Sequence, residues 1–364
     1  MGHTLTLSTY TYNDARLVDE LLASVATWSR RPDEIIVTDD GSAVPYVGPP
    51  GVRVIRLSEN RGITVAKRTG ISAATSDLIL SIDCDARLAP DWLDIVTPGI
   101  LRPEVGLAGG STSHVAGEDA VSHYLARFGD NHNGTAKGPV EFIPGNAFLI
   151  RREVWQQIEG FGPHDRRVLE DHVLCARLTK SGFTLHADGD AKCVQIRRLS
   201  RIAMCKRLWS WLEPAATARL PADPDAIGFA LDVFVRPLVE RVHSALEIDD
   251  PRLIYLDILH VGYELCELLL DRVRAQPAST LYDEFRGELA ARLAAHPAVD
   301  ELLRADLEQL GHALAPPARH PAWSEVFLVL EALEDAGFFD WMASEGVAAI
   351  RRDDAMAHDF SSYA

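Results

Sequence analysis

The sequence predicts an α/β fold, with a doubly wound, mostly parallel sheet followed by an α-helical C-terminal region. Up to about residue 110, short apolar runs alternate with amphipathic helical segments, whereas after residue 200 apolar residues recur at helical spacing. The formal net charge is -17, and most of the acidic excess falls after residue 200. We therefore expect two domains, at 1–200 and 201–364.

Within the first domain, apolar runs predict parallel strands and the segments between them predict helices. Residues 111–138 break this pattern, because they are rich in Gly, Ser, His and Asn, and they are predicted to form a mobile functional loop. The predicted strands are 4–8, 34–38, 52–57, 77–82, 140–150, 183–186 and 192–196. The predicted helices are 14–28, 62–74, one from residue 90, one from residue 151, and 168–180.

The region after residue 200 is predicted to be helical throughout, with Pro237 interrupting one helix. Three roles stay open for it: covering the functional site, forming a homodimer, and binding a partner protein. The predicted helices are 225–246, 250–274, 282–295, 298–314 and 324–342.

Composition excludes several classes of protein. The hydrophobic fraction of 47% and charged fraction of 24% are those of an ordinary globular chain of 364 residues. The acidic balance argues against binding to duplex nucleic acid, which needs a basic surface. Five cysteines without a CxxC spacing favour a reduced, cytoplasmic setting, and neither a signal peptide nor an 18-residue apolar run is visible.

Carboxylates follow two of the predicted strands. Asp39 and Asp40 end one strand, and Asp83 and Asp85 follow another. Because ligands of open α/β sheets bind beyond the carboxyl ends of the strands, these four groups are expected to converge and to repel one another without a cation. Hard oxygen ligands suit Mg²⁺ or Mn²⁺, which in turn favours a phosphorylated nucleotide ligand. The alternative is a set of solvated turn residues, since Asp-Gly-Ser is also ordinary turn chemistry.

Motifs of other enzyme classes are missing from the sequence. There is no GxGxxG dinucleotide loop, no GxxxxGK[ST] phosphate loop, no HExxH and no GxSxG. The sequence therefore shows none of the usual signatures of dehydrogenases, P-loop NTPases, zinc proteases of the HExxH type or α/β-hydrolases.

Six short motifs occur in a fixed order along the first two hundred residues. They are Thr9–Asn13, Asp39–Ser42, Asn60–Gly62 with Ala66–Gly70, Asp83–Asp85, Gly145–Arg152, and Glu170–Asp171. In this order and spacing they resemble those of a GT-A-type nucleotide-sugar glycosyltransferase of family 2, with Asp83–Asp85 in the place of its DxD motif. The helices after residue 200 are not covered by the resemblance.

The resemblance implies an inverting enzyme that moves a sugar from a nucleoside-diphosphate sugar to an acceptor hydroxyl, assisted by Mn²⁺ or Mg²⁺. The acceptor would be a carbohydrate, a lipid-linked molecule or a peptide. Asp171 would be the general base with Glu170 beside it, and Asp85 and Asp83 would bind the metal. Contacts to the donor are implied for Thr9, Tyr12, Asp39, Asp40, Asn60, Gly62, Lys67 and Asp83.

Some features depart from this family pattern or leave alternatives open. Many members place a histidine where Gln195 stands, so metal coordination is lighter, His186 substitutes, or turnover is reduced. A non-catalytic binding protein on a decayed transferase fold is one alternative. A nucleotidyltransferase is another, although residues 9–17 lack the Gly and Lys of its phosphate loop. The basic amphipathic segment 197–212 predicts peripheral contact with the inner face of a membrane. Its alternative is a helix that closes over the diphosphate and packs on the catalytic domain.

Overall fold

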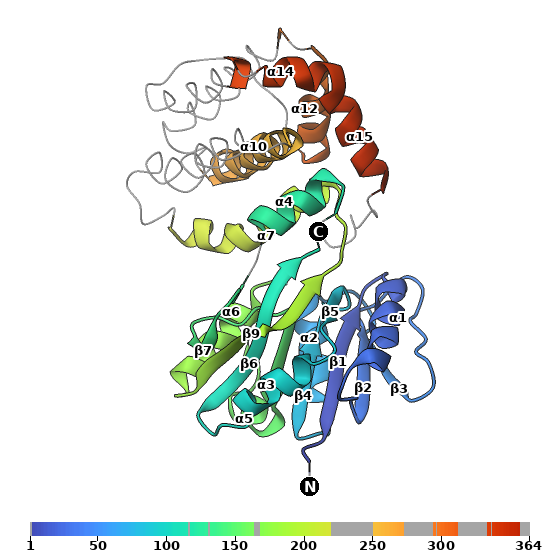
Figure 1. Cartoon of the computed structure of the whole chain (residues 1–364), viewed down its shortest axis with the longest axis vertical. Helices are drawn as coiled ribbons and strands as arrows, with labels where there is room; N and C mark the ends of the chain where they lie inside the picture. Colours follow the sequence, from blue (N-terminus) through green and yellow to red (C-terminus); the bar gives the residue numbers. More distant parts are fainter. Residues whose placement is uncertain are drawn as a thin grey trace. The chain divides into compact units, whose positions relative to one another are not determined.

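The computed structural model divides the chain into two compact units (Figure 1). Unit 1 comprises residues 1–116 and 125–197, and unit 2 comprises residues 117–124 and 198–364. The residues that the structure describes are 2–115, 117–129, 132–163, 168–219, 250–272, 294–295, 297–311, 333–335 and 337–356.

One half of the sheet in unit 1 is parallel, as the sequence predicts. Strands β1 (Leu5–Thr11), β2 (Glu34–Asp39), β3 (Val52–Arg56) and β4 (Leu78–Ile82) lie in the order β3-β2-β1-β4, all paired in parallel. Helices α1 (Ala15–Ser24) and α2 (Ile63–Ser72) are the crossovers. The carboxyl ends of β1, β2 and β4 therefore meet along one edge of the sheet.

The other half of the sheet is mixed. Strand β8 pairs antiparallel with both β4 and β6, while β6 and β9 pair in parallel, and β5 and β7 pair antiparallel with β9. The bounds are β5 (Ala86–Leu88), β6 (Val105–His114), β7 (Lys137–Val140), β8 (Ala147–Arg151) and β9 (Thr184–Gln195). The helices are α3 (Trp92–Ile100), α4 (Ala120–Phe128), α5 (Arg152–Gln157) and α6 (Glu170–Lys180). The fold class is thus confirmed, with antiparallel strands added to the parallel core.

The predicted mobile loop at 111–138 is wrong. Residues 111–114 complete β6, α4 follows, and β7 begins at Lys137. The reason is packing: a Cβ on Gly110 would lie 1.9 Å from the carbonyl oxygen of Ala191, so the small residues mark a closely approached strand. The two strands predicted at 183–186 and 192–196 are the single strand β9, and the strand predicted at 140–150 is shorter.

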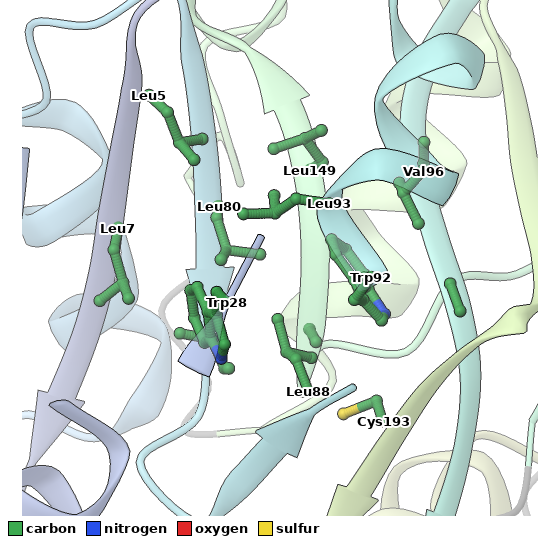
Figure 2. Packing of buried hydrophobic residues seen from close by; sticks show 14 of the residues in the cluster. Leu5, Leu7, Trp28, Leu80, Leu88, Trp92, Leu93, Val96, Leu149 and Cys193 are labelled. Carbon is green, nitrogen blue, oxygen red and sulfur yellow. The ribbon is translucent and has the colours of Figure 1, made fainter. Parts of the chain in front are cut away.

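Two apolar clusters cover the faces of this sheet. One includes Leu5 and Leu7 of β1 and Leu80 of β4, packed with Trp28 and Trp92 (Figure 2). The other gathers around Ile36, Ile79 and Phe148, with Leu174 and Leu178 of α6. Burial on both faces explains why the parallel strands read as continuous apolar runs in the sequence.

Unit 2 is helical where the structure describes it. Its helices are α7 (Arg201–Arg219), α10 (Arg252–Arg272), α12 (Pro297–Gln309), α14 (Phe338–Trp341) and α15 (Val347–Met356), with a π-helical turn at Met342–Gly346. Helices α10 and α12 confirm two predictions. The helices predicted at 225–246 and 282–295 lie outside the described residues, as does most of 324–342, and helix continues beyond Met342 instead.

A buried ion pair joins α7 to α12. Arg201 donates two hydrogen bonds of 2.7 Å to Asp306, which is fully buried and also accepts one from the hydroxyl of Tyr255. The guanidinium of Arg201, which lies in the segment 197–212 predicted to contact a membrane, is therefore buried within unit 2 and does not face a membrane surface. Among the described residues, no helix is long and apolar enough to span a membrane.

Candidate functional site

The turn after β2 is organised by Asp39. Its carboxylate accepts hydrogen bonds from the backbone N–H of Ser42 (2.9 Å) and of Tyr46 (3.0 Å), and from the Arg56 guanidinium. Burial opposes its ionisation, but these donors outweigh burial and lower the pKa of Asp39. Asp39 thus holds the shape of this turn, and its implied contact with a nucleotide stays a prediction.

Asp40 ties that turn to the N-terminus of α2. One carboxylate oxygen accepts from the N–H of Arg61 (2.8 Å) and the other from the N–H of Gly62 (2.9 Å). Asn60 also accepts from Gly62, at 3.1 Å. Gly41 has a φ of +75°, and a Cβ there would lie 2.3 Å from the Glu59 carbonyl carbon, so glycine is required for the two loops to meet. The structure therefore brings Asp40, Asn60 and Gly62 together, as the motif order implies.

Lys67 lies at the centre of the candidate site. Its side chain is 3% exposed, and its Nζ lies 2.7 Å from Glu170, 3.0 Å from Asp83, and 2.8 Å from the carbonyl oxygen of Gly145. Burial by itself would lower the pKa of Lys67, but the two carboxylates outweigh it and hold the pKa well above the usual value. One ammonium thereby joins α2, the end of β4 and the start of α6.

Asp83 and Asp85 are each held by a different cation. Asp83 contacts Lys67, whereas Asp85 pairs with Arg197 at 2.5 Å. Arg197 also pairs with Asp14 at 2.8 Å. Burial raises the pKa of Asp83, Lys67 lowers it, and the neighbouring charge of Asp85 adds to the increase, so that the net shift is upward.

Helix α6 begins with the two predicted catalytic carboxylates. Leu169, at its N-cap, takes a left-handed backbone conformation with φ of 67°, which sets the direction in which Glu170 and Asp171 leave the loop. Asp171 accepts hydrogen bonds from the backbone N–H of Gly145 and of His172, both at 2.8 Å, and its Oδ1 lies 3.1 Å from Nδ1 of His172. Burial would raise the pKa of Asp171, but these donors and the charge of Lys67 hold it below the usual value. The carboxylate is therefore ionised at neutral pH.

Gly145 is a component of the site that residue chemistry does not indicate. A Cβ at this position would lie 2.9 Å from both the Lys67 Nζ and the Glu170 Oε1, and 3.2 Å from the Asp171 Cβ. Its carbonyl binds Lys67 and its N–H binds Asp171, so a bare backbone is needed here. The sequence shows it within the Gly145–Arg152 motif but gives no signal of this role.

The remaining predicted donor contacts lie near the end of β1. Thr9 is 2% exposed, and among the described residues its hydroxyl has no hydrogen-bond partner. Tyr12 follows the strand and is partly buried. Gln195 is buried at the end of β9, opposite Ala86 of β5. His186 lies elsewhere on β9 and is partly buried. Its ring lies against α3, since a Cβ added to Gly99 would come within 2.5 Å of it.

The carboxylates of the site meet part of what a small divalent cation requires. Among the described residues, no group of three or more His, Cys, Asp or Glu side chains is arranged to hold a metal. Mg²⁺ nevertheless uses one or two protein carboxylates and completes its shell with phosphate and water oxygens. Asp83 and Asp85 meet that requirement chemically, although in this structure each already has a cationic partner.

Comparison with known proteins finds a family match over part of the chain. Residues 8–159 match the family described as glycosyl transferase family 2. A pre-mycofactocin glycosyltransferase of Mycobacterium tuberculosis is 30% identical over 170 residues, covering 43% of this chain and 36% of that protein. An N-acetylglucosaminyltransferase of Bradyrhizobium elkanii is 32% identical over 107 residues, covering 27% of this chain and 59% of that protein. The chain therefore spans about a third of the first relative and less than two thirds of the second.

A solved structure shows a weaker likeness over more of the chain. A mannosyltransferase from Pyrobaculum calidifontis, in complex with GDP-Man and Mn²⁺, has a TM-score of 0.45 at 17% sequence identity. The match covers 98% of this chain and 88% of that one.

Proposed function

We propose that this chain, which carries a glycosyltransferase family 2 domain, transfers a sugar from a nucleoside-diphosphate sugar to an acceptor hydroxyl. The observation that carries the proposal is the position of Asp171: an ionised, mostly buried carboxylate linked through Gly145 and Lys67 to Asp83. The proposed base and the carboxylates that are implied to bind the nucleotide sugar therefore lie in one cluster at the carboxyl edge of the sheet.

The donor would bind at the ends of β1 and β2. The implied contacts for the nucleoside are the Thr9 hydroxyl, which has no partner in the described part of the chain, and the loop joined by Asp40, Asn60 and Gly62. Tyr12, which follows β1, is a further implied contact. Lys67 places a positive charge 3.0 Å from Asp83, and this charge would attract the diphosphate of the donor. Asp83 and Asp85 would hold Mn²⁺ or Mg²⁺, which when bound stabilises the negative charge that develops on the leaving diphosphate.

Asp171 is proposed to act as the general base. As the acceptor oxygen forms its bond to the anomeric carbon, the bond from that carbon to the diphosphate oxygen breaks, and the acceptor proton passes to Asp171. A single displacement of this kind inverts the anomeric centre. Because the pKa of Asp171 is lowered, its effectiveness rests on its position rather than on basicity. The hydrogen bond from Gly145 fixes that position.

The test is release of a nucleoside diphosphate from a panel of nucleotide sugars in the presence of Mn²⁺, with purified full-length protein. Asp171→Asn keeps the shape of the side chain and is expected to lower kcat by about 10²- to 10⁴-fold, the usual contribution of a general base. Asp190→Asn, at an exposed carboxylate of β9, is the matched control and is expected to retain the wild-type rate.

Two results would contradict the proposal. Binding of no donor across the panel would remove the transferase assignment. Binding without turnover, with Asp171→Asn indistinguishable from wild type, would favour the non-catalytic alternative. The acceptor class is tested afterwards with carbohydrate, lipid-linked and peptide hydroxyl compounds, using the donor that the panel identifies.

A further inference from the structure

The side chain of Arg197 occupies an enclosed position between two carboxylates of unit 1. It follows β9, is 9% exposed, and pairs through Nε with Asp85 (2.5 Å) and through Nη1 with Asp14 (2.8 Å). The side chains of Asp14 and Asp85 are themselves 6% and 8% exposed. The remaining Nη2 lies 3.7 Å from the Cys84 sulfur, so the whole guanidinium is enclosed.

This pairing falls on the residue to which the metal is assigned. The Oδ2 atom of Asp85 already accepts a short hydrogen bond from a permanent cation, because a guanidinium does not lose its proton in proteins. A divalent ion brought to the same carboxylate would meet a positive charge at close range, in surroundings that water screens poorly. The cation and the guanidinium are therefore alternatives at Asp85.

A second anion would resolve this competition. A diphosphate presents pairs of negative oxygens that the planar guanidinium can bind with two hydrogen bonds, as it binds a carboxylate. It therefore offers Arg197 an alternative partner to Asp85. It also supplies the oxygens that complete a Mg²⁺ or Mn²⁺ shell. The nucleotide thus favours both the release of Arg197 and the arrival of the metal.

We propose that Arg197 is the resident counter-ion of Asp85 and excludes divalent cations from the donor-free protein, so that metal and nucleoside diphosphate bind cooperatively. This inference rests on the proposed function, since it takes Asp85 as a metal ligand. It adds a residue that determines when the metal binds. Asp14 holds the other edge of the guanidinium and so positions Arg197 on Asp85 in the absence of nucleotide.

The test is a calorimetric titration of Mn²⁺ into full-length protein without any sugar donor. Arg197→Met is expected to bind Mn²⁺ at least tenfold more tightly than wild type, and Arg198→Met, at the exposed neighbouring arginine, is expected to match wild type. Addition of saturating UDP or GDP is expected to tighten Mn²⁺ binding to wild type by at least tenfold and to have a smaller effect on Arg197→Met. Asp85→Asn in the Arg197→Met background is expected to abolish the gain.

The arginine variant leaves two carboxylates buried, so a second variant guards against misfolding. Arg197→Met combined with Asp14→Asn removes one of those carboxylates and leaves Asp85 for the metal. If neither variant binds Mn²⁺ more tightly than wild type, the inference is overturned. Because no turnover is measured, these outcomes are separate from failure of the donor panel to release a nucleoside diphosphate.

Discussion

Replacing Lys67 with methionine removes the cation shared by α2, the end of β4 and the start of α6, while keeping the length of the aliphatic chain. The ammonium lies 3.0 Å from Asp83 and 2.7 Å from Glu170, and it is 3% exposed. The variant therefore leaves two buried carboxylates close together with no cation between them. We expect unit 1 to lose stability for this reason.

The expected loss follows from the two distances. At an effective dielectric constant near 20, each pair at this range has a gross attraction of about 6 kcal/mol. Most of that attraction offsets the cost of burying the charges, and removal of one partner from a buried pair typically costs about 3–5 kcal/mol. For a domain of this size, a loss of that magnitude corresponds to a decrease in Tm of about 10 °C.

The assay is thermal unfolding at pH 7 and again at lower pH, with Lys180→Met as the control at an exposed lysine of α6. Burial already raises the pKa of Asp83, and loss of Lys67 raises it further. The deficit should therefore be largest above that pKa and shrink as the pH falls through it, because protonation removes the unpaired charge. A decrease in Tm no larger than that of the control at pH 7 would refute the central role of Lys67.

Asp39→Asn should destabilise unit 1 by about 2–4 kcal/mol at pH 7, since its amide cannot satisfy the donors of Ser42, Tyr46 and Arg56. Because the pKa of Asp39 is lowered, its stabilising effect is complete above the pKa that it has in the unfolded chain and is lost in acid. In urea unfolding, the stability difference between wild type and Asp39→Asn should therefore shrink below about pH 4. A difference that does not depend on pH would contradict this. Arg201→Met should destabilise unit 2 by about 3–5 kcal/mol in the same assay, because Asp306 is left buried without its cation. A change in the free energy of unfolding below about 1 kcal/mol would show that the buried pair does not stabilise the unit. Four described thiols are buried and have a raised pKa, so their alkylation at pH 8, mapped by mass spectrometry, should be at least about 100-fold slower than that of free cysteine. Fast labelling of any of them would show that the element carrying it opens. They are Cys84, Cys175, Cys193 and Cys205.

The sequence predicted the parallel strands because each is a short apolar run between turn residues, and burial on both faces produces that pattern. It did not predict β6 as a strand. Its residues Gly109 and Gly110 have low strand propensity, and glycine is used there because Ile143, Ala191 and Trp92 approach too closely for a side chain. Close approach is a property of the assembled fold and has no local signal.

The same distinction applies to the candidate site. Asp83, Asp85, Glu170 and Asp171 could each be selected, because carboxylates at strand ends and helix starts are a local pattern. Their partners could not be, since the Lys67–Glu170 contact joins residues 103 positions apart. Arg197 and Asp14 are 183 positions apart, and nothing near either residue indicates the pairing.

Residues 117–124 belong to unit 2, although the chain on both sides of them belongs to unit 1. Tyr124 donates a hydrogen bond to Asp257, and Asp353 accepts one from the N–H of Ala120. During synthesis this segment leaves the ribosome more than a hundred residues before its partners exist. A gene fragment ending near residue 197 would therefore encode a first unit in which Tyr124 lacks Asp257 and His260, which it contacts in the full chain. Separate expression of the two units calls for excision or redesign of this short segment, not a single cut.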